Sequence, residues 1–171
     1  KTVTENVGFI VVIAITAAVL LAAAKLGEMW AGVSSSQQIR TKKIVTIGMM
    51  SALAFILQSF AFPVPFAPPF YKLDFSEVPV LICAFAMGPV AGVASELLKN
   101  VLKILFRGTT TAFVGDYANF VIGCSFIIPA AILYFKHKTK KTAIIGCVAG
   151  TIIIAIFGSL FNAFYLLPAF S

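Results

Sequence analysis

The chain has 171 residues, of which 60% are hydrophobic and only 11% are charged. A soluble globular protein is about 45–50% apolar and about 25% charged. This composition cannot cover a water-facing surface, so it excludes a soluble enzyme. It indicates an all-α integral membrane protein, a polytopic helical bundle with about six transmembrane helices.

Long uncharged runs separated by polar or glycine-proline breaks predict the helices. The first run has no basic cluster before it, and its apolar part is longer than the core of a signal peptide, so we interpret it as a transmembrane helix. The third run is short because Gly88 and Pro89 stop it. The predicted helices cover residues 7–30, 44–62, 78–87, 90–106, 113–135 and 142–167.

The positive charge lies in two clusters, which predict the topology. The chain has 13 basic and 6 acidic residues, and basic clusters occupy 40–43 and 136–141. Basic loops of membrane proteins lie in the cytoplasm. Four predicted spans separate the clusters, so both fall on the same side, and the loop 63–77 is external. We interpret the positive charge as a signal of orientation in the cell membrane and expect no nucleic acid partner.

A proline-rich aromatic segment stands in the predicted external loop. Residues 62–71 contain four of the eight prolines, interleaved with aromatic residues, which excludes a regular helix. Phe66 and Phe70 are candidates for an aromatic mouth over a flat ligand. The structural alternative is an interfacial aromatic belt. Asp74 or Ser76 is expected to cap the following helix, and Glu77 is expected to interact favourably with the positive end of that helix.

A polar stripe runs along the fourth predicted helix. Translocon scales put one charge at the bilayer centre at about 2.5–3.5 kcal/mol, so we expect the stripe to face protein or a water-filled cavity. A Glu96–Lys99 pair that only joins helices is the structural alternative, and Lys103 and Arg107 can snorkel to the interface. The stripe consists of Glu96, Lys99, Asn100, Lys103 and Arg107.

Further polar residues are predicted at a similar depth on the last two helices. Asp116 and Asn119 are one turn apart, and Asn162 lies near the outer end of the last helix. Amide, carboxylate and ammonium groups under an aromatic loop suit a neutral, polyhydroxylated aromatic solute. Each asparagine alone could equally be an interhelical hydrogen bond.

No set of residues typical of catalysis is present in the sequence. It has a single histidine, in a basic loop, and contains neither a zinc-protease motif nor a phosphate-binding loop. We therefore expect no catalytic residue, metal or catalytic cofactor. Active transport would need an energy source in a partner subunit.

The order of these motifs resembles the substrate-binding S components of energy-coupling factor (ECF) transporters, and among them the riboflavin-specific type. The matching motifs are the loop ending in 72–79, the Gly-Pro-Val-Ala-Gly at 88–92, the Glu-Leu-Leu-Lys-Asn at 96–100, residues 115–123 and residues 162–168. The resemblance covers about residues 39–171. Residues 1–38 are then an additional helix and a polar linker, and the last of the family's six helices is expected to be missing after Ser171.

The resemblance implies high-affinity capture of riboflavin from outside as a transported ligand, with no chemistry performed on it. It implies as partners a transmembrane T component and two ATPase subunits, with Gly48 and Ala52 as the docking motif for them. By the same resemblance the substrate-binding residues are Phe66, Phe70, Asp74, Lys99, Asn100, Asp116, Asn119 and Asn162. Two alternatives are an S component for folate or thiamin and a membrane subunit that holds flavin or joins helices in a larger complex.

Overall fold

The computed structural model describes residues 2–32, 39–63, 72–108 and 114–161 and consists of six helices and one short two-stranded sheet. The all-helical architecture predicted from composition is confirmed, and each predicted helix has a counterpart in the described chain; the predicted end of the last helix, residues 162–167, lies outside the described residues. The helices are α1 Thr2–Trp30, α2 Ile39–Ser59, α3 Glu77–Met87, α4 Pro89–Arg107, α5 Val114–His137 and α6 Lys140–Phe161.

Three helices of the described chain are long and apolar enough to cross a membrane: Val11–Trp30, Thr41–Ser59 and Gly115–His137. Helix α3 has 11 residues and is too short to span a bilayer by itself. Helix α4 has 19 residues, and its sequence includes the charged stripe. The predicted number of about six transmembrane helices is therefore not confirmed, since length and composition identify three spans among the described residues.

The sheet lies at the base of the proline-rich loop and was not predicted. Strands β1, Phe62–Pro63, and β2, Lys72–Leu73, pair antiparallel, with Phe62 opposite Leu73. The pairing brings the two ends of the loop together next to the start of α3. The loop's intervening residues lie outside the described chain.

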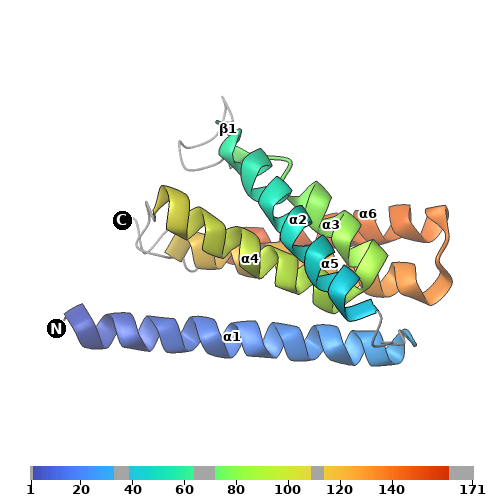
Figure 1. Ribbon diagram of the computed structural model, residues 1–171, viewed down its shortest axis with the longest axis horizontal. Coiled ribbons are helices and arrows are strands. Elements are labelled where there is room, and N and C mark those ends of the chain that lie inside the picture. The colour runs from blue at the N-terminus through green and yellow to red at the C-terminus, as the bar shows by residue number, and fades with distance from the viewer. Residues whose placement is uncertain (1, 33–38, 64–71, 109–113, 162–171) are drawn as a thin grey trace.

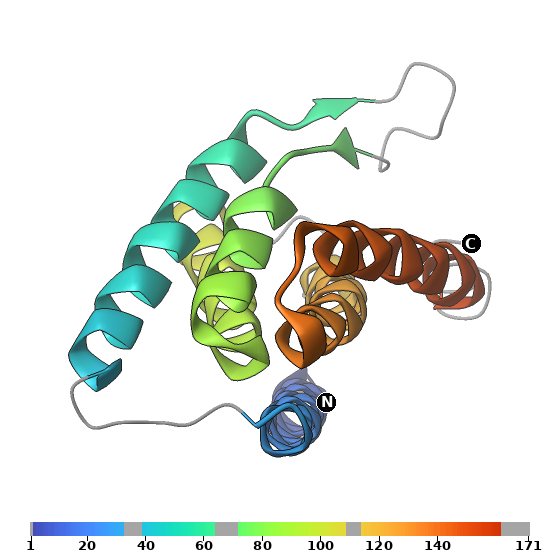
Figure 2. The ribbon, with the colours of Figure 1, turned by 90° about the vertical axis from the view of Figure 1, so that its right-hand side faces the viewer.

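The helices form a bundle in which α4 contacts α1, α2, α3 and α5. Figure 1 shows α1 running along α4 and α5, while α2 and α3 cross them obliquely. Figure 2 shows α2 and α3 on one side of the bundle and the α5–α6 pair on the other. Buried apolar residues form two clusters between these elements. They are Ala54, Val80, Ala84, Ile127 and Ala131 in one cluster, and Ala24, Val93, Phe120 and Cys124 in the other.

The two basic clusters lie at the same end of the bundle, as the span count predicts. Lys43 forms an ion pair with Glu28 of α1 at 3.5 Å, and Lys136 lies 4.3 Å from the centre of the Trp30 ring. Both contacts join the last turns of α1 to a basic cluster. The sheet lies at the opposite end of α2 and α3 (Figure 1).

Glycines allow the closest contacts between helices. A Cβ atom at Gly92 of α4 would lie 2.6 Å from Ala84 of α3 and 2.6 Å from Ile127 of α5. A Cβ atom at Gly146 of α6 would lie 2.9 Å from the backbone oxygen of Ala130. Since lipid supplies little hydrophobic drive for helix association, close packing through small residues is a main source of stability in such bundles.

The glycine contact between α5 and α6 yields a prediction. Gly146→Ala should lower the thermal unfolding temperature of the detergent-solubilised protein, because the new methyl group meets a backbone atom, at a cost of about 1–3 kcal/mol. Gly158→Ala is the matched control, since a Cβ atom there meets nothing within 4 Å and alanine is the better helix former. Equal effects of the two substitutions would contradict the packing described.

Candidate functional site

A fully buried lysine organises the polar interior. Lys99 of α4 has no exposed surface. Its ammonium donates to Glu77 Oε1 at 2.8 Å and to Ser76 Oγ at 3.3 Å, and it lies 2.7 Å from Glu96 Oε2. Two of the three N–H donors of the ammonium are used in these hydrogen bonds, and Glu96 is held as an ion pair. The three partners join α4 to the segment that starts α3.

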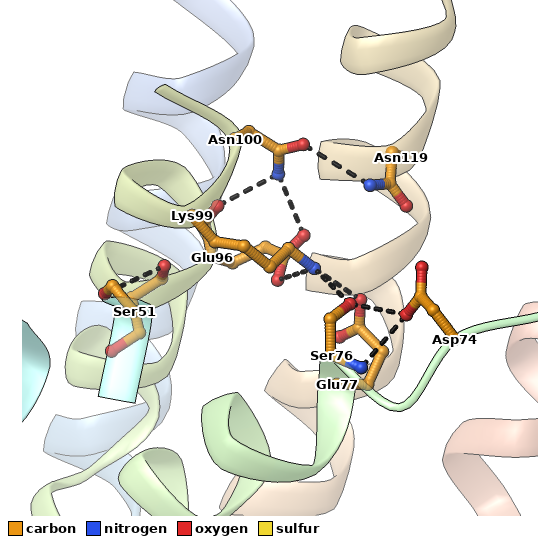
Figure 3. Close-up of polar contacts among 9 residues, drawn as sticks. Ser51, Asp74, Ser76, Glu77, Glu96, Lys99, Asn100 and Asn119 are labelled. Carbon is orange, nitrogen blue, oxygen red and sulfur yellow. Dashed lines mark hydrogen bonds and ion pairs between the residues drawn. The ribbon is translucent and has the colours of Figure 1, made fainter. Parts of the chain in front are cut away.

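The hydrogen bonds continue from Lys99 in two directions, as Figure 3 shows. Toward the loop, Ser76 donates from its hydroxyl to Asp74 Oδ1 at 2.6 Å and from its backbone N–H to the same oxygen at 3.0 Å. Toward α5, Asn100 Nδ2 donates to Glu96 Oε1 at 2.9 Å, and Asn119 Nδ2 lies 3.4 Å from Asn100 Oδ1. One network therefore connects the end of the loop, α4 and α5.

A glycine on α5 makes room for the two carboxylates of this network. A Cβ atom at Gly123 would lie 2.7 Å from Glu96 Oε1 and 3.3 Å from Glu77 Oε1. The absence of a side chain at Gly123 lets both glutamates reach the same ammonium. Two carboxylates thus share one positive charge, and Glu77 Oε2 has no hydrogen-bond partner among the described residues.

A second ion pair lies one turn further along α4. Lys103 Nζ lies 2.7 Å from Asp116 Oδ1, and the Lys103 side chain keeps 29% of its surface exposed while that of Asp116 keeps 5%. The other oxygen, Asp116 Oδ2, is buried and has no hydrogen-bond partner in the described chain. Unpartnered buried acceptors are costly, so the oxygens of Glu77 and Asp116 are suited to receive donors from a ligand or water.

Five of the predicted site residues are brought together by the fold. Lys99 and Asn100 lie on α4, Asp116 and Asn119 on α5, and Asp74 just before α3. The polar stripe of α4 faces α3 and α5, as the cost of charge in lipid predicted, and Arg107 at its end is exposed. The other three candidates, Phe66, Phe70 and Asn162, lie outside the described residues.

The predicted docking residues lie apart from this network, on the outer side of α2. Ala52 is exposed, and a Cβ atom at Gly48 would meet nothing within 4 Å. The buried side of α2 is formed by other residues, among them Ser51, whose hydroxyl donates to the backbone oxygen of Ser95 on α4 at 3.2 Å. Neither Gly48 nor Ala52 is used for packing within the described bundle.

Two details of the sequence interpretation are wrong. Lys103 does not only snorkel to the interface, because it pairs with Asp116 across two helices. The side chain of Ser76, the residue before α3, makes no capping hydrogen bond to the helix. It instead accepts a hydrogen bond from Lys99 and donates one to Asp74.

Sequence reasoning also missed two members of the network, Glu77 and Gly123. Glu77 was expected only to favour the positive end of α3, although it directly contacts Lys99. No pattern in the sequence marks Gly123, since its role depends on which face of α5 meets Glu96.

The central lysine yields a second prediction. Lys99→Met should destabilise the protein by about 3–5 kcal/mol, because it leaves buried carboxylates without a counter-charge. Adding Glu96→Gln to Lys99→Met should recover part of the loss. Arg107→Met, on the exposed end of the same helix, is the control and should change little. Denaturation of the purified protein in detergent measures all three, and a Lys99→Met variant as stable as Arg107→Met would refute the role of the network.

Comparisons with known proteins place these features in a family. The family model for the ECF transporter substrate-specific component matches residues 42–171. The riboflavin transporter RibU of Staphylococcus aureus (strain TCH60) is 43% identical over 131 residues, which are 77% of this chain and 68% of that protein. The riboflavin transporter FmnP of Bacillus subtilis (strain 168) is 38% identical over 134 residues, 78% of this chain and 70% of that protein.

A solved structure agrees with the sequence comparisons. It was described as the S component of a bacterial ECF transporter, and it superposes with a TM-score of 0.69 at 43% identity, covering 75% of this chain and 76% of the other. The matched region contains the Lys99 network and the outer face of α2. The chain therefore belongs to the family of substrate-specific components of ECF transporters.

Proposed function

We propose that this chain is the membrane subunit that binds riboflavin and mediates its uptake in an ECF transporter. The observation that carries the proposal is the 43% identity to a riboflavin transporter over a region that includes the whole buried polar network. A substrate-specific component captures its ligand and is a transport subunit, so the chain itself needs no catalytic residues. We propose that ATP hydrolysis takes place in two ATPase subunits of the complex.

The chemistry of the network supports a ligand with an aromatic ring system and a hydroxylated chain. Asn100 and Asn119 carry amides, which both donate and accept hydrogen bonds. Asp116 Oδ2 and Glu77 Oε2 are acceptors without a partner in the described chain, so they suit hydroxyl or N–H donors. We propose Asp74, Lys99, Asn100, Asp116 and Asn119 as the substrate-binding residues, with Phe66, Phe70 and Asn162 completing the site.

Within this set, Lys99 serves a positioning role. Its ammonium is fully buried and lies against three protein oxygens, so it is not open to a ligand. It holds the end of the external loop against α4 and thereby orients Asn100. Lys99 is therefore a residue that shapes the site, and the amides are the groups that contact the substrate.

We also propose the orientation of the chain and its docking face. The end with both basic clusters is cytoplasmic by the positive-inside rule, and the sheet and loop 63–77 are external. The uncovered outer face of α2, with Gly48 and Ala52, is suited to close contact with a helix of the transmembrane T component, because small residues let helices approach. The open space at Gly48 is the observation behind this assignment.

Binding can be tested on the purified protein. Riboflavin fluorescence should be quenched on titration with the wild-type protein, and folate or thiamin should not compete. Asn119→Ala should weaken riboflavin binding by about tenfold or more, the effect of losing one good hydrogen bond in a desolvated site. The matched control is Ser125→Ala on the same helix, whose hydroxyl bonds only to its own helix backbone at Val121. A wild-type protein that ignores riboflavin would refute the function.

Docking is tested separately from binding. Ala52→Trp should leave riboflavin affinity unchanged but abolish uptake in cells that express the complete transporter, because the bulky side chain separates the helices. Leu53→Trp is the control. Leu53 is exposed like Ala52, with 47% of its surface accessible, but it lies about 100° away from Ala52 around the axis of α2. Equal uptake by the Ala52→Trp and Leu53→Trp variants would contradict the docking face.

A further inference from the structure

Helix α1 lies outside residues 42–171, the region that the family model matches, yet it is packed into the bundle. Ala24 is fully buried among residues of α4 and α5, and a Cβ atom at Gly27 would lie 2.5 Å from Ile132 of α5. The less exposed positions of α1 recur with the helical period from Ile13 to Glu28. One face of α1 therefore packs against α4 and α5, and the opposite face is exposed on the outside of the bundle.

A polar contact fixes the far end of α1. Glu28 Oε1 accepts a hydrogen bond from the backbone N–H of Val90 at 3.1 Å and pairs with Lys43 at 3.5 Å. Val90 stands in the first turn of α4, where a carboxylate is favoured by the helix dipole. Gly88 has φ of 103°, and a Cβ atom there would lie 2.5 Å from Glu28 Oε1. The carboxylate thus fixes the position of α1 along α4.

With α1 in this position, its N-terminal half closes a small cavity against the proposed site. The cavity has a volume of about 80 Å³ and lies between Ile13 of α1 and residues of α4 and α5, including Asn100, Asp116, Tyr117 and Phe120. Its walls are mainly apolar. Asp116 is 95% buried, and its Oδ2 atom has no hydrogen-bond partner in the described chain. The surface that faces the cavity is apolar, and two of the proposed substrate-binding residues, Asn100 and Asp116, stand in its wall.

We propose that α1 forms one wall of the riboflavin site and that Ile13 is a specificity-determining contact there. The volume admits only a few non-hydrogen atoms, and the surface that meets them is apolar. The part of the ligand that enters is therefore a small apolar edge, whose carbon atoms contact Ile13. This inference rests on the proposed function.

The test compares two isoleucines of α1. Ile13→Trp fills the cavity and should weaken riboflavin binding by about tenfold or more, measured by fluorescence quenching. Ile15→Trp is the matched control, since Ile15 is 57% exposed and lies about 200° around the helix, and it should bind as the wild type does. Ile13→Ala, which removes atoms and cannot overpack the site, should weaken binding about threefold, while Ile15→Ala should not.

The outcomes separate this inference from the proposed function. If the wild type binds riboflavin and both Ile13 variants bind it equally well, α1 is not part of the site, and the proposed function stands. If Ile13→Trp does not fold, an unchanged affinity of Ile13→Ala overturns the inference by itself. If the wild type does not bind riboflavin, the proposed function fails and this inference fails with it.

Discussion

The ammonium of Lys99 is the interaction on which the rest of the structure depends. Burying a charge in a membrane protein costs several kcal/mol, and the fold offsets this cost because three oxygens surround the ammonium and two of them belong to carboxylates. Those oxygens belong to Ser76, Glu77 and Glu96. The lysine therefore fixes where the proline-rich loop ends relative to α4, and the network that it anchors positions the amides of Asn100 on α4 and Asn119 on α5.

Apolar packing alone would leave this arrangement poorly determined. The lipid-facing and protein-facing residues of a membrane helix are equally apolar, so burial gives little information on how a helix is rotated or shifted. The bundle defines rotation and register through small residues and isolated polar contacts. Gly123 admits Glu96, Gly146 brings α6 against the backbone of α5, and Glu28 sets the position of α1 along α4. The hydrophobic clusters fill the space between these contacts.

The sequence predicted the six helices because uncharged runs and their interruptions are a strong signal in a membrane protein. It also predicted that Glu96 and Lys99 are buried, since lipid would not tolerate them. It did not predict the pairing of Lys103 with Asp116 or of Lys99 with Glu77, because those pairs depend on the relative rotation of separate helices. The short β1–β2 sheet was missed for a related reason: its pairing is set by how the loop closes, and its two-residue strands carry no periodic pattern.

The central claim is that substrate is bound next to the Lys99 network, between α4 and α5. The most direct measurement is an experimental structure of the protein with riboflavin bound. The account predicts that the hydroxylated chain of riboflavin lies within hydrogen-bond distance of Asn119 or Asp116, with the Lys99 contacts to Glu77 and Glu96 intact. A vitamin bound elsewhere, without contact to α4 or α5, would contradict it.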